Sequence, residues 1–137
     1  MYRDHFITEL RRRLPDDLPV GLCVLDDQMR VTDWNRTLAK WTGIDAEQIQ
    51  SELLVDFYPH LKAPRYQQRL KDVLSKNLPV VFSAAIHKHF IPVQATESGR
   101  GLMYQETVAH PIPGFPGYVV ITISDVTARY LQTEALR

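Results

Sequence analysis

The sequence predicts an α+β domain: one five-stranded antiparallel sheet with helices packed on one face. Short apolar runs rich in β-branched residues occur as a pair near the start of the chain and as three in succession near its end. Helical patterns lie between the two groups. Because a lone two-stranded hairpin is unstable in water, the early pair should join the late three in one sheet.

The first elements are a helix, a hairpin and a second helix. Residues 1–17 have the apolar spacing of a leader helix, and they are followed by predicted strands at Val20–Leu25 and 29–34, which flank a polar turn. Asn35 then caps a helix, because its amide oxygen can accept from the free amides of a first helical turn. Gly43 ends that helix.

The middle of the chain is helical. Asp45 and Gln48 have the spacing of a capping box, so a short helix should begin there. Residues 57–61 read as a bend, and 63–78 as a longer helix with Pro64 in its first turn. The apolar face of this helix consists of Tyr66, Leu70, Val73 and Leu74.

Three strands and an outgoing helix complete the chain. The strands are predicted at 80–91, 102–112 and 118–125, joined by glycine-containing and proline-containing loops into an antiparallel meander. We therefore expect a leader helix at 1–17, one domain at 18–127 and the start of an output-linking helix at 128–137.

Composition excludes several classes of protein. The chain has 137 residues, 45% of them hydrophobic, and its 16 basic and 16 acidic side chains cancel, so nothing in the charge balance attracts nucleic acid. Cys23 is the one cysteine, which suggests a reducing compartment. With neither a signal peptide nor a membrane-spanning apolar stretch, we expect a cytoplasmic segment without membrane contact, either complete or part of a larger protein.

Four short motifs occur in a characteristic order. They are Leu-Asp-Asp at 25–27, Asp-Trp-Asn at 33–35, Trp-Thr-Gly at 41–43 and Asp-Val-Thr at 125–127. Together with the order of elements, they resemble a PAS domain over residues 18–128. The resemblance implies a small pocket between sheet and helices and a sensory or dimerising role. It also implies an output domain, such as a histidine kinase or diguanylate cyclase, that receives the signal through the outgoing helix.

The family's aspartate-x-threonine junction falls on Asp125 and Thr127, and its helix-entry asparagine on Asn35. As a hinge, the Asp125 carboxylate would pair with a basic group of the domain while the Thr127 hydroxyl caps the outgoing helix. The simpler alternative is a strand end followed by a helix cap. For Asn35, capping alone is a sufficient role.

A non-covalent ligand, or none, is expected in the pocket. Either Tyr66 or Tyr104 could orient a ligand through its hydroxyl, although the same side chains could simply fill the core. The candidate pocket residues are Phe57, Tyr66, Phe82, Ile86, Tyr104 and Val108.

The usual cofactors of such domains are disfavoured, and no metal is expected. Residues 65–78, where some PAS domains carry a haem histidine, contain none, and two imidazoles at His87 and His89 are too few for structural zinc. His60 is the remaining haem candidate. Cys23 lies in a strand rather than in the helical motif of a light-reactive cysteine, so it should behave as a small buried hydrophobe.

Two other kinds of function remain open. A small cone-shaped α+β enzyme could use Asp33, Asp56 or Glu106 as a buried general base, but the sequence contains none of the phosphate-binding, zinc-protease or nucleophile-elbow motifs. We therefore expect this segment not to be an enzyme. The other alternative is a ligand-free interaction module, a homodimer in which the leader helices pack together or lie across the neighbour's sheet.

Overall fold

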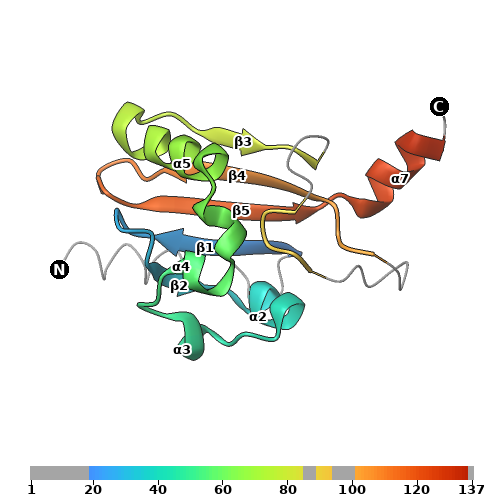
Figure 1. Cartoon of the computed structure of the whole chain (residues 1–137), viewed down its shortest axis with the longest axis horizontal. Coiled ribbons are helices and arrows are strands. Elements are labelled where there is room, and N and C mark those ends of the chain that lie inside the picture. The colour runs from blue at the N-terminus through green and yellow to red at the C-terminus, as the bar shows by residue number, and fades with distance from the viewer. Residues whose placement is uncertain (1–18, 85–88, 94–100, 136–137) are drawn as a thin grey trace.

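The computed structural model describes residues 19–84, 89–93 and 101–135 of the chain. Its centre is one antiparallel sheet in the order β2-β1-β5-β4-β3, so the early pair of strands joins the late three, as predicted (Figure 1). β1 pairs with β2 on one side and with β5 on the other. The strands are β1 (Val20–Leu25), β2 (Val31–Trp34), β3 (Val80–Phe82), β4 (Gln105–Pro111) and β5 (Val119–Asp125).

The helices between β2 and β3 cover one face of this sheet, with the longest of them, α5, lying in front of β3, β4 and β5 (Figure 1). They are α2 (Arg36–Thr42), α3 (Ala46–Ile49), α4 (Leu54–Phe57), the 3₁₀ helix η1 (Pro59–Lys62) and α5 (Pro64–Lys76). A last helix, α7 (Thr127–Ala135), leaves the end of β5 and projects beyond the sheet.

Alternation along the strands divides the sheet into an inner and an outer face. In β5 the inner positions Val119, Ile121 and Ile123 are fully buried, whereas the residues between them are partly exposed. In β4 the inner residues are Gln105, Thr107 and Ala109, two of them polar. The main core therefore lies between this inner face and the helices, and it contains buried polar groups on β4.

Asn35 does more than cap α2. Its Oδ1 accepts from the amide of Leu38 at 3.0 Å, which is the predicted cap, and also from the amide of Leu22 at 3.1 Å. Its Nδ2 donates to the carbonyl oxygen of Val20 at 2.9 Å. One side chain thus joins the start of α2 to strand β1.

Gly21 lets α2 pack closely against β1. A Cβ at this position would lie 2.6 Å from Cδ2 of Leu38 and 3.1 Å from Cζ3 of Trp41. Helix α2 then ends at Gly43, whose φ of 73° lies in the left-handed region that glycine adopts without strain. The predicted capping box of Asp45 and Gln48 is present at the start of α3.

Two predicted strands are shorter in the structure. The segment predicted as 80–91 leaves the sheet after Phe82, and Ala84 is helical. Phe90 and Ile91 lie in a loop, where their amides donate to the side chain of Gln105 instead of a neighbouring strand. A buried apolar run has the same pattern in a strand and in a packed loop, so hydrophobicity alone could not distinguish them. The segment predicted as 102–112 is a strand only at Gln105–Pro111.

The predicted bend at 57–61 contains the end of α4 and most of η1. The outgoing helix begins at Thr127, one residue earlier than predicted. The predicted leader helix at 1–17 lies outside the described residues. No helix within the described ranges is both long and apolar enough to cross a bilayer.

Candidate functional site

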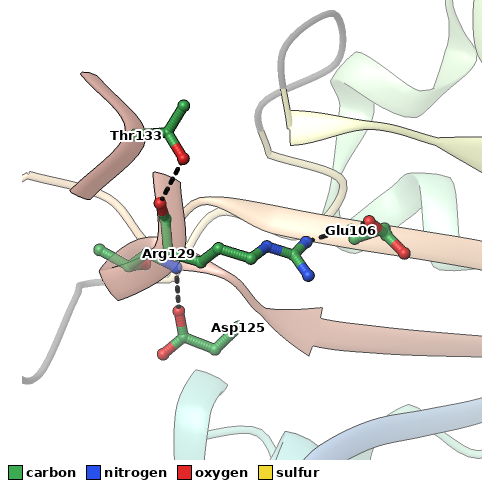
Figure 2. A network of polar contacts seen from close by, with 5 residues as sticks. Glu106, Asp125, Arg129 and Thr133 are labelled. Carbon is green, nitrogen blue, oxygen red and sulfur yellow. Dashed lines mark hydrogen bonds and ion pairs between the residues drawn. The ribbon is translucent and has the colours of Figure 1, made fainter. Parts of the chain in front are cut away.

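The junction between β5 and α7 is the first candidate site. Asp125 is the last residue of β5, and its Oδ1 accepts a hydrogen bond of 2.9 Å from the amide of Thr127, in the first turn of α7. Figure 2 shows the Asp125 carboxylate directed toward the beginning of this helix. A carboxylate in this place satisfies a free amide and opposes the positive end of the helix dipole.

Thr127 faces the domain. The side chain is buried, and its Oγ1 accepts from the amide of Tyr104 at 2.9 Å, while the amide of Val126 donates to the carbonyl oxygen of Tyr104 at 2.8 Å. The contacts predicted for the junction are therefore exchanged. The carboxylate of Asp125 caps the helix, and the hydroxyl of Thr127 binds the domain.

Two further contacts hold α7 against the residues around the start of β4. The rings of Tyr104 and Tyr130 stack with centroids 4.1 Å apart and planes 19° from parallel. Arg129 pairs with Glu106, with 3.2 Å between Nη2 and Oε2, at the surface (Figure 2). Among the described contacts, Asp125 has no ion pair with a basic group of the domain; the nearby Arg129 belongs to α7 and pairs with Glu106.

The second candidate site is an aromatic cluster between α5 and the inner face of the sheet. Tyr66 of α5 stacks on Phe82 of β3 with centroids 5.8 Å apart, and both rings contact Phe90, at 6.0 Å and 5.2 Å. All three side chains are buried. The ring of His60 meets Tyr66 edge-on at 5.6 Å, and its Nε2 lies 2.9 Å from the carbonyl oxygen of Phe90.

Two polar atoms beside this cluster lack partners. Thr107, which lies opposite Phe82 across the β3–β4 ladder, is fully buried, and its Oγ1 has no hydrogen-bond partner in the described part of the chain; the same holds for Nε of Arg69. The Arg69 guanidinium lies 5.3 Å from the Phe82 ring centroid and donates to the carbonyl oxygen of Val81 at 2.6 Å. A hydroxyl and a guanidinium nitrogen near Phe82 could therefore each bind a further group.

A family model described as the PAS fold matches residues 16–131 of this chain. The chain belongs to the PAS family. PAS domains are sensory modules without catalytic activity of their own, so the expected non-enzymatic character of the segment agrees with its family. A search of curated proteins found no match.

Solved PAS structures share the whole fold at low sequence identity. A sensory box sensor histidine kinase from Vibrio cholerae superposes with a TM-score of 0.62 at 19% identity, covering 92% of this chain and 94% of that one. The photoactive yellow protein domain of the sensor histidine kinase Ppr from Rhodospirillum centenum superposes with a TM-score of 0.61 at 19% sequence identity. The match covers 80% of this chain and 94% of that one. The PAS domain of the quorum-sensing receptor RpfR from Cronobacter turicensis, solved in complex with BDSF, superposes with a TM-score of 0.60 at 9% sequence identity. The match covers 81% of this chain and 97% of that one.

The predicted pocket residues of this PAS domain do not lie together. Tyr66 and Phe82 meet in the aromatic cluster, whereas Tyr104 lies at the α7 junction. Phe57 is 36% exposed on α4, and Val108 lies on the outer face of the sheet because β4 alternates around it, so neither faces the cluster. Ile86 lies outside the described residues. Phe90, Thr107 and Arg69 were not among the predicted residues, because their places depend on the loop after β3, on the register of β4 and on how α5 packs against β3.

Two of the histidines that the structure describes, His60 and His89, bind backbone carbonyl oxygens, whereas His110 is exposed on β4. Nδ1 of His89 lies 2.9 Å from the carbonyl oxygen of Met103, as His60 lies against Phe90. His87 is outside the described residues. Within the described ranges, no group of three or more histidine, cysteine, aspartate or glutamate residues could hold a metal ion.

Cys23 is completely buried in β1, facing the core. Burial, with a smaller contribution from the negative charge of Asp33, raises the pKa of its thiol to about 12. The thiol is therefore neutral at physiological pH, as the prediction of a small buried hydrophobe requires.

The three carboxylates of the enzyme alternative do not converge. Asp33 is on β2 and Glu106 on β4, with β1 and β5 between them, which corresponds to three strand spacings or roughly 14 Å. Asp56 is exposed on α4. Glu106 is occupied by Arg129 at the surface, so these residues form no common acid-base site.

Proposed function

We propose that this chain is the sensory input module of a signal-transduction protein of the histidine kinase or diguanylate cyclase type. In this proposal residues 18–127 sense, and α7 carries the signal to a C-terminal output domain. The proposal also includes a homodimer that forms through the leader helix at 1–17, and a cytoplasmic location. One observation supports the relay above all: α7 is bound to two different strands, through Asp125 at the end of β5 and through Tyr104 beside β4.

The contacts of the junction explain how a small change in the sheet could move the helix. Asp125 sets where α7 begins, and the Tyr104 amide and ring set how its first turns lie against the domain. Gln105 and Asp125 are directly opposite each other in the β4–β5 ladder. A shift of one strand past the other would therefore strain both sets of contacts and reorient α7.

Variants of the junction test the relay. A chimera that joins this chain to the catalytic core of a histidine kinase through α7 should change its autophosphorylation rate when Thr127→Val removes the acceptor for Tyr104. Thr133→Val is the matched control, because the Thr133 hydroxyl only donates to the carbonyl of Arg129 within the exposed part of α7 (Figure 2). Equal rates for the wild type and both variants would contradict a relay through α7.

We also propose that the aromatic cluster binds a small ligand that presents an anionic or hydrogen-bond-accepting group to Arg69 and Thr107. The support is a pair of buried polar atoms near Phe82, Oγ1 of Thr107 and Nε of Arg69, that have no hydrogen-bond partner among the described residues. A carboxylate could accept from both the guanidinium and the hydroxyl. The rings of the cluster would contact the apolar part of the ligand.

The ligand proposal has a direct test. Mass spectrometry and absorbance of the purified protein report a retained molecule, and calorimetry can compare octanoate with 1-octanol, which share a chain length and differ in charge. Tighter binding of octanoate, lost in Arg69→Gln and kept in Lys71→Gln on the same helix, is the expected result. An absence of any binding or retained molecule would favour the ligand-free interaction module.

A further inference from the structure

The side chain of Gln105 binds the backbone of the loop that contains Phe90 and Ile91, which pair with no strand of the sheet. Its side chain is buried at the first position of β4, and its Oε1 accepts from the amides of Phe90 at 3.0 Å and Ile91 at 3.1 Å. Its Nε2 donates to the carbonyl oxygen of Ile91 at 2.6 Å and lies 3.7 Å from Sδ of Met103. The primary amide thus replaces the neighbouring strand that Phe90 and Ile91 lack.

The loop bound by Gln105 belongs to the aromatic cluster. Phe90 contributes its ring to the cluster, and its carbonyl oxygen is bound by His60 of η1. A change in the packing of Tyr66 or Phe82 therefore reaches the two backbone amides that Gln105 accepts from. Leaving these buried amides unpaired is costly, so Gln105 should move with the loop.

On its other side, Gln105 adjoins the anchor of α7. The preceding residue, Tyr104, donates to Thr127 and accepts from Val126 through its backbone, and Gln105 itself lies opposite Asp125 in the ladder. The chain of contacts from His60 through Phe90 and Gln105 to Tyr104 and α7 is continuous. No other side chain in the described part of the chain binds the backbone of Phe90 or Ile91 from β4 or β5.

We propose that Gln105 is the positioning residue that couples the aromatic cluster to α7. This inference rests on the proposed sensory function and names the connection through which that function would operate. The described hydrogen bonds of Gln105 reach the loop and Met103, not the proposed ligand-binding residues Arg69 and Thr107 and not α7. It acts by fixing the position of the Phe90 loop relative to the start of β4.

A second tie must be distinguished from this one. Nδ1 of His89 lies 2.9 Å from the carbonyl oxygen of Met103, and the His89 and Tyr104 rings are 5.9 Å apart. This route also joins the loop to the region before β4. The amide of Met103 also donates to the carbonyl oxygen of Val93 at 2.7 Å, farther along the same loop. Among the side chains of the sheet in the described ranges, only Gln105 binds the backbone of Phe90 and Ile91.

Amide hydrogen exchange of this chain tests the proposal through a double-mutant cycle. His60→Ala disturbs the cluster by removing the contact with the Phe90 carbonyl, and the readout is exchange at the amides of Val126 and Tyr130. In the wild-type background, His60→Ala should speed their exchange several-fold. In a Gln105→Met background, which keeps the side-chain length but cannot pair with the loop, it should have no further effect.

The same cycle is repeated with His89→Ala in place of Gln105→Met, and there the response to His60→Ala should persist. The proposal is overturned if His60→Ala leaves α7 unchanged in the wild type, if the response survives Gln105→Met, or if only His89→Ala abolishes it. If the Gln105→Met variant does not fold, amide exchange of the wild-type protein tests the coupling instead. The amides of Phe90 and Ile91 should then open with the same free energy as those of Val126 and Tyr130 over a denaturant series, and distinct values contradict the coupling.

These outcomes are separable from failure of the proposed function. The kinase chimera reports whether α7 carries a signal at all, whereas the exchange cycle reports only how the cluster reaches α7. A chimera that responds to Thr127→Val but not to Gln105→Met would retain the relay and reject Gln105 as its entry.

Discussion

The amide of Tyr104 donates a 2.9 Å hydrogen bond to the hydroxyl of Thr127, which joins the approach to β4 to the first turn of α7. Thr127→Val keeps the shape of the side chain but leaves this amide without an acceptor. We expect the variant to lose about 1–3 kcal/mol in free energy of unfolding, measured by urea denaturation. Thr133→Val should stay within about 0.5 kcal/mol of wild type, because the Thr133 hydroxyl is exposed. Equal losses in the two variants would show that the Tyr104 contact is unimportant.

Asp125 should stabilise α7 mainly through the hydrogen bond that its side-chain oxygen accepts, and less through its negative charge. Asp125→Ala removes the acceptor for the Thr127 amide and should lower stability by about 1 kcal/mol. Asp125→Asn retains an acceptor oxygen and should lose clearly less. Circular dichroism and urea denaturation can rank the three proteins. If Asn and Ala were equally harmful, the carboxylate charge rather than the cap would be the stabilising feature.

Replacing Asn35 should lower the free energy of unfolding by more than the loss of an ordinary helix cap does. Asn35→Ala removes the bonds to Leu38, Leu22 and Val20 together, so we expect a loss of about 2–3 kcal/mol, against the roughly 1 kcal/mol of a typical cap. Asn35→Asp keeps both accepted bonds but sets a carboxylate oxygen against the Val20 carbonyl oxygen in place of the donor, so it should recover only part of the loss in Asn35→Ala. A loss in Asn35→Ala no larger than that of a simple cap would argue against the tie to β1.

Gly21→Ala should destabilise the domain through overpacking. The added methyl group would lie 2.6 Å from Cδ2 of Leu38, and the expected cost is about 1–3 kcal/mol. Leu38→Ala alone should cost about 2–5 kcal/mol by leaving a cavity. In the double variant the new methyl group partly fills that cavity, so the combined loss in thermal or urea unfolding should be smaller than the sum. Strict additivity would contradict the close approach of α2 to β1.

Cys23 should make stability depend on alkaline pH. The thiol has an ordinary pKa of 9.0, and burial raises it to about 12 in the folded state. Between these values the unfolded chain loses the proton and the folded chain keeps it, so unfolding becomes easier as pH rises by up to about 1.4 kcal/mol per pH unit. Below pH 9 the contribution is fully present. Cys23→Ala removes this slope, and the difference between the two proteins in urea unfolding at pH 8 and pH 10 isolates it from other titrating groups.

Some parts of the site could be predicted because they depend on short spacings. The cap at Asn35 and the capping box at Asp45 and Gln48 require only a few consecutive residues, and both are present. The strand ends at Asp125 as predicted and the helix begins at Thr127, but the predicted contacts of the two side chains are exchanged. Which group each side chain binds depends on where Tyr104 lies, and Tyr104 is 21 residues or more away in the sequence.

The rest of the site depends on register and on a loop. Val108 and Thr107 are adjacent in sequence and equally compatible with a strand, but the β4 register directs only Thr107 toward Phe82. Phe90 was predicted in a strand and instead enters the core from a loop held by Gln105. A shift of one residue in register would exchange the faces of every side chain on β4, and the sequence pattern there is too mixed to specify it.

Local sequence patterns specify the α+β class, the five strands, the starts of α2, α3 and α5 and the end of β5, but not the helices α4 and η1. These follow from hydrophobic periodicity and capping, which act over a few residues. Tertiary contacts place Thr107 and Arg69 near one aromatic ring and Gln105 between the Phe90 loop and the anchor of α7. Such relations arise from strand pairing and packing between residues distant in the chain, where many arrangements satisfy the same local preferences.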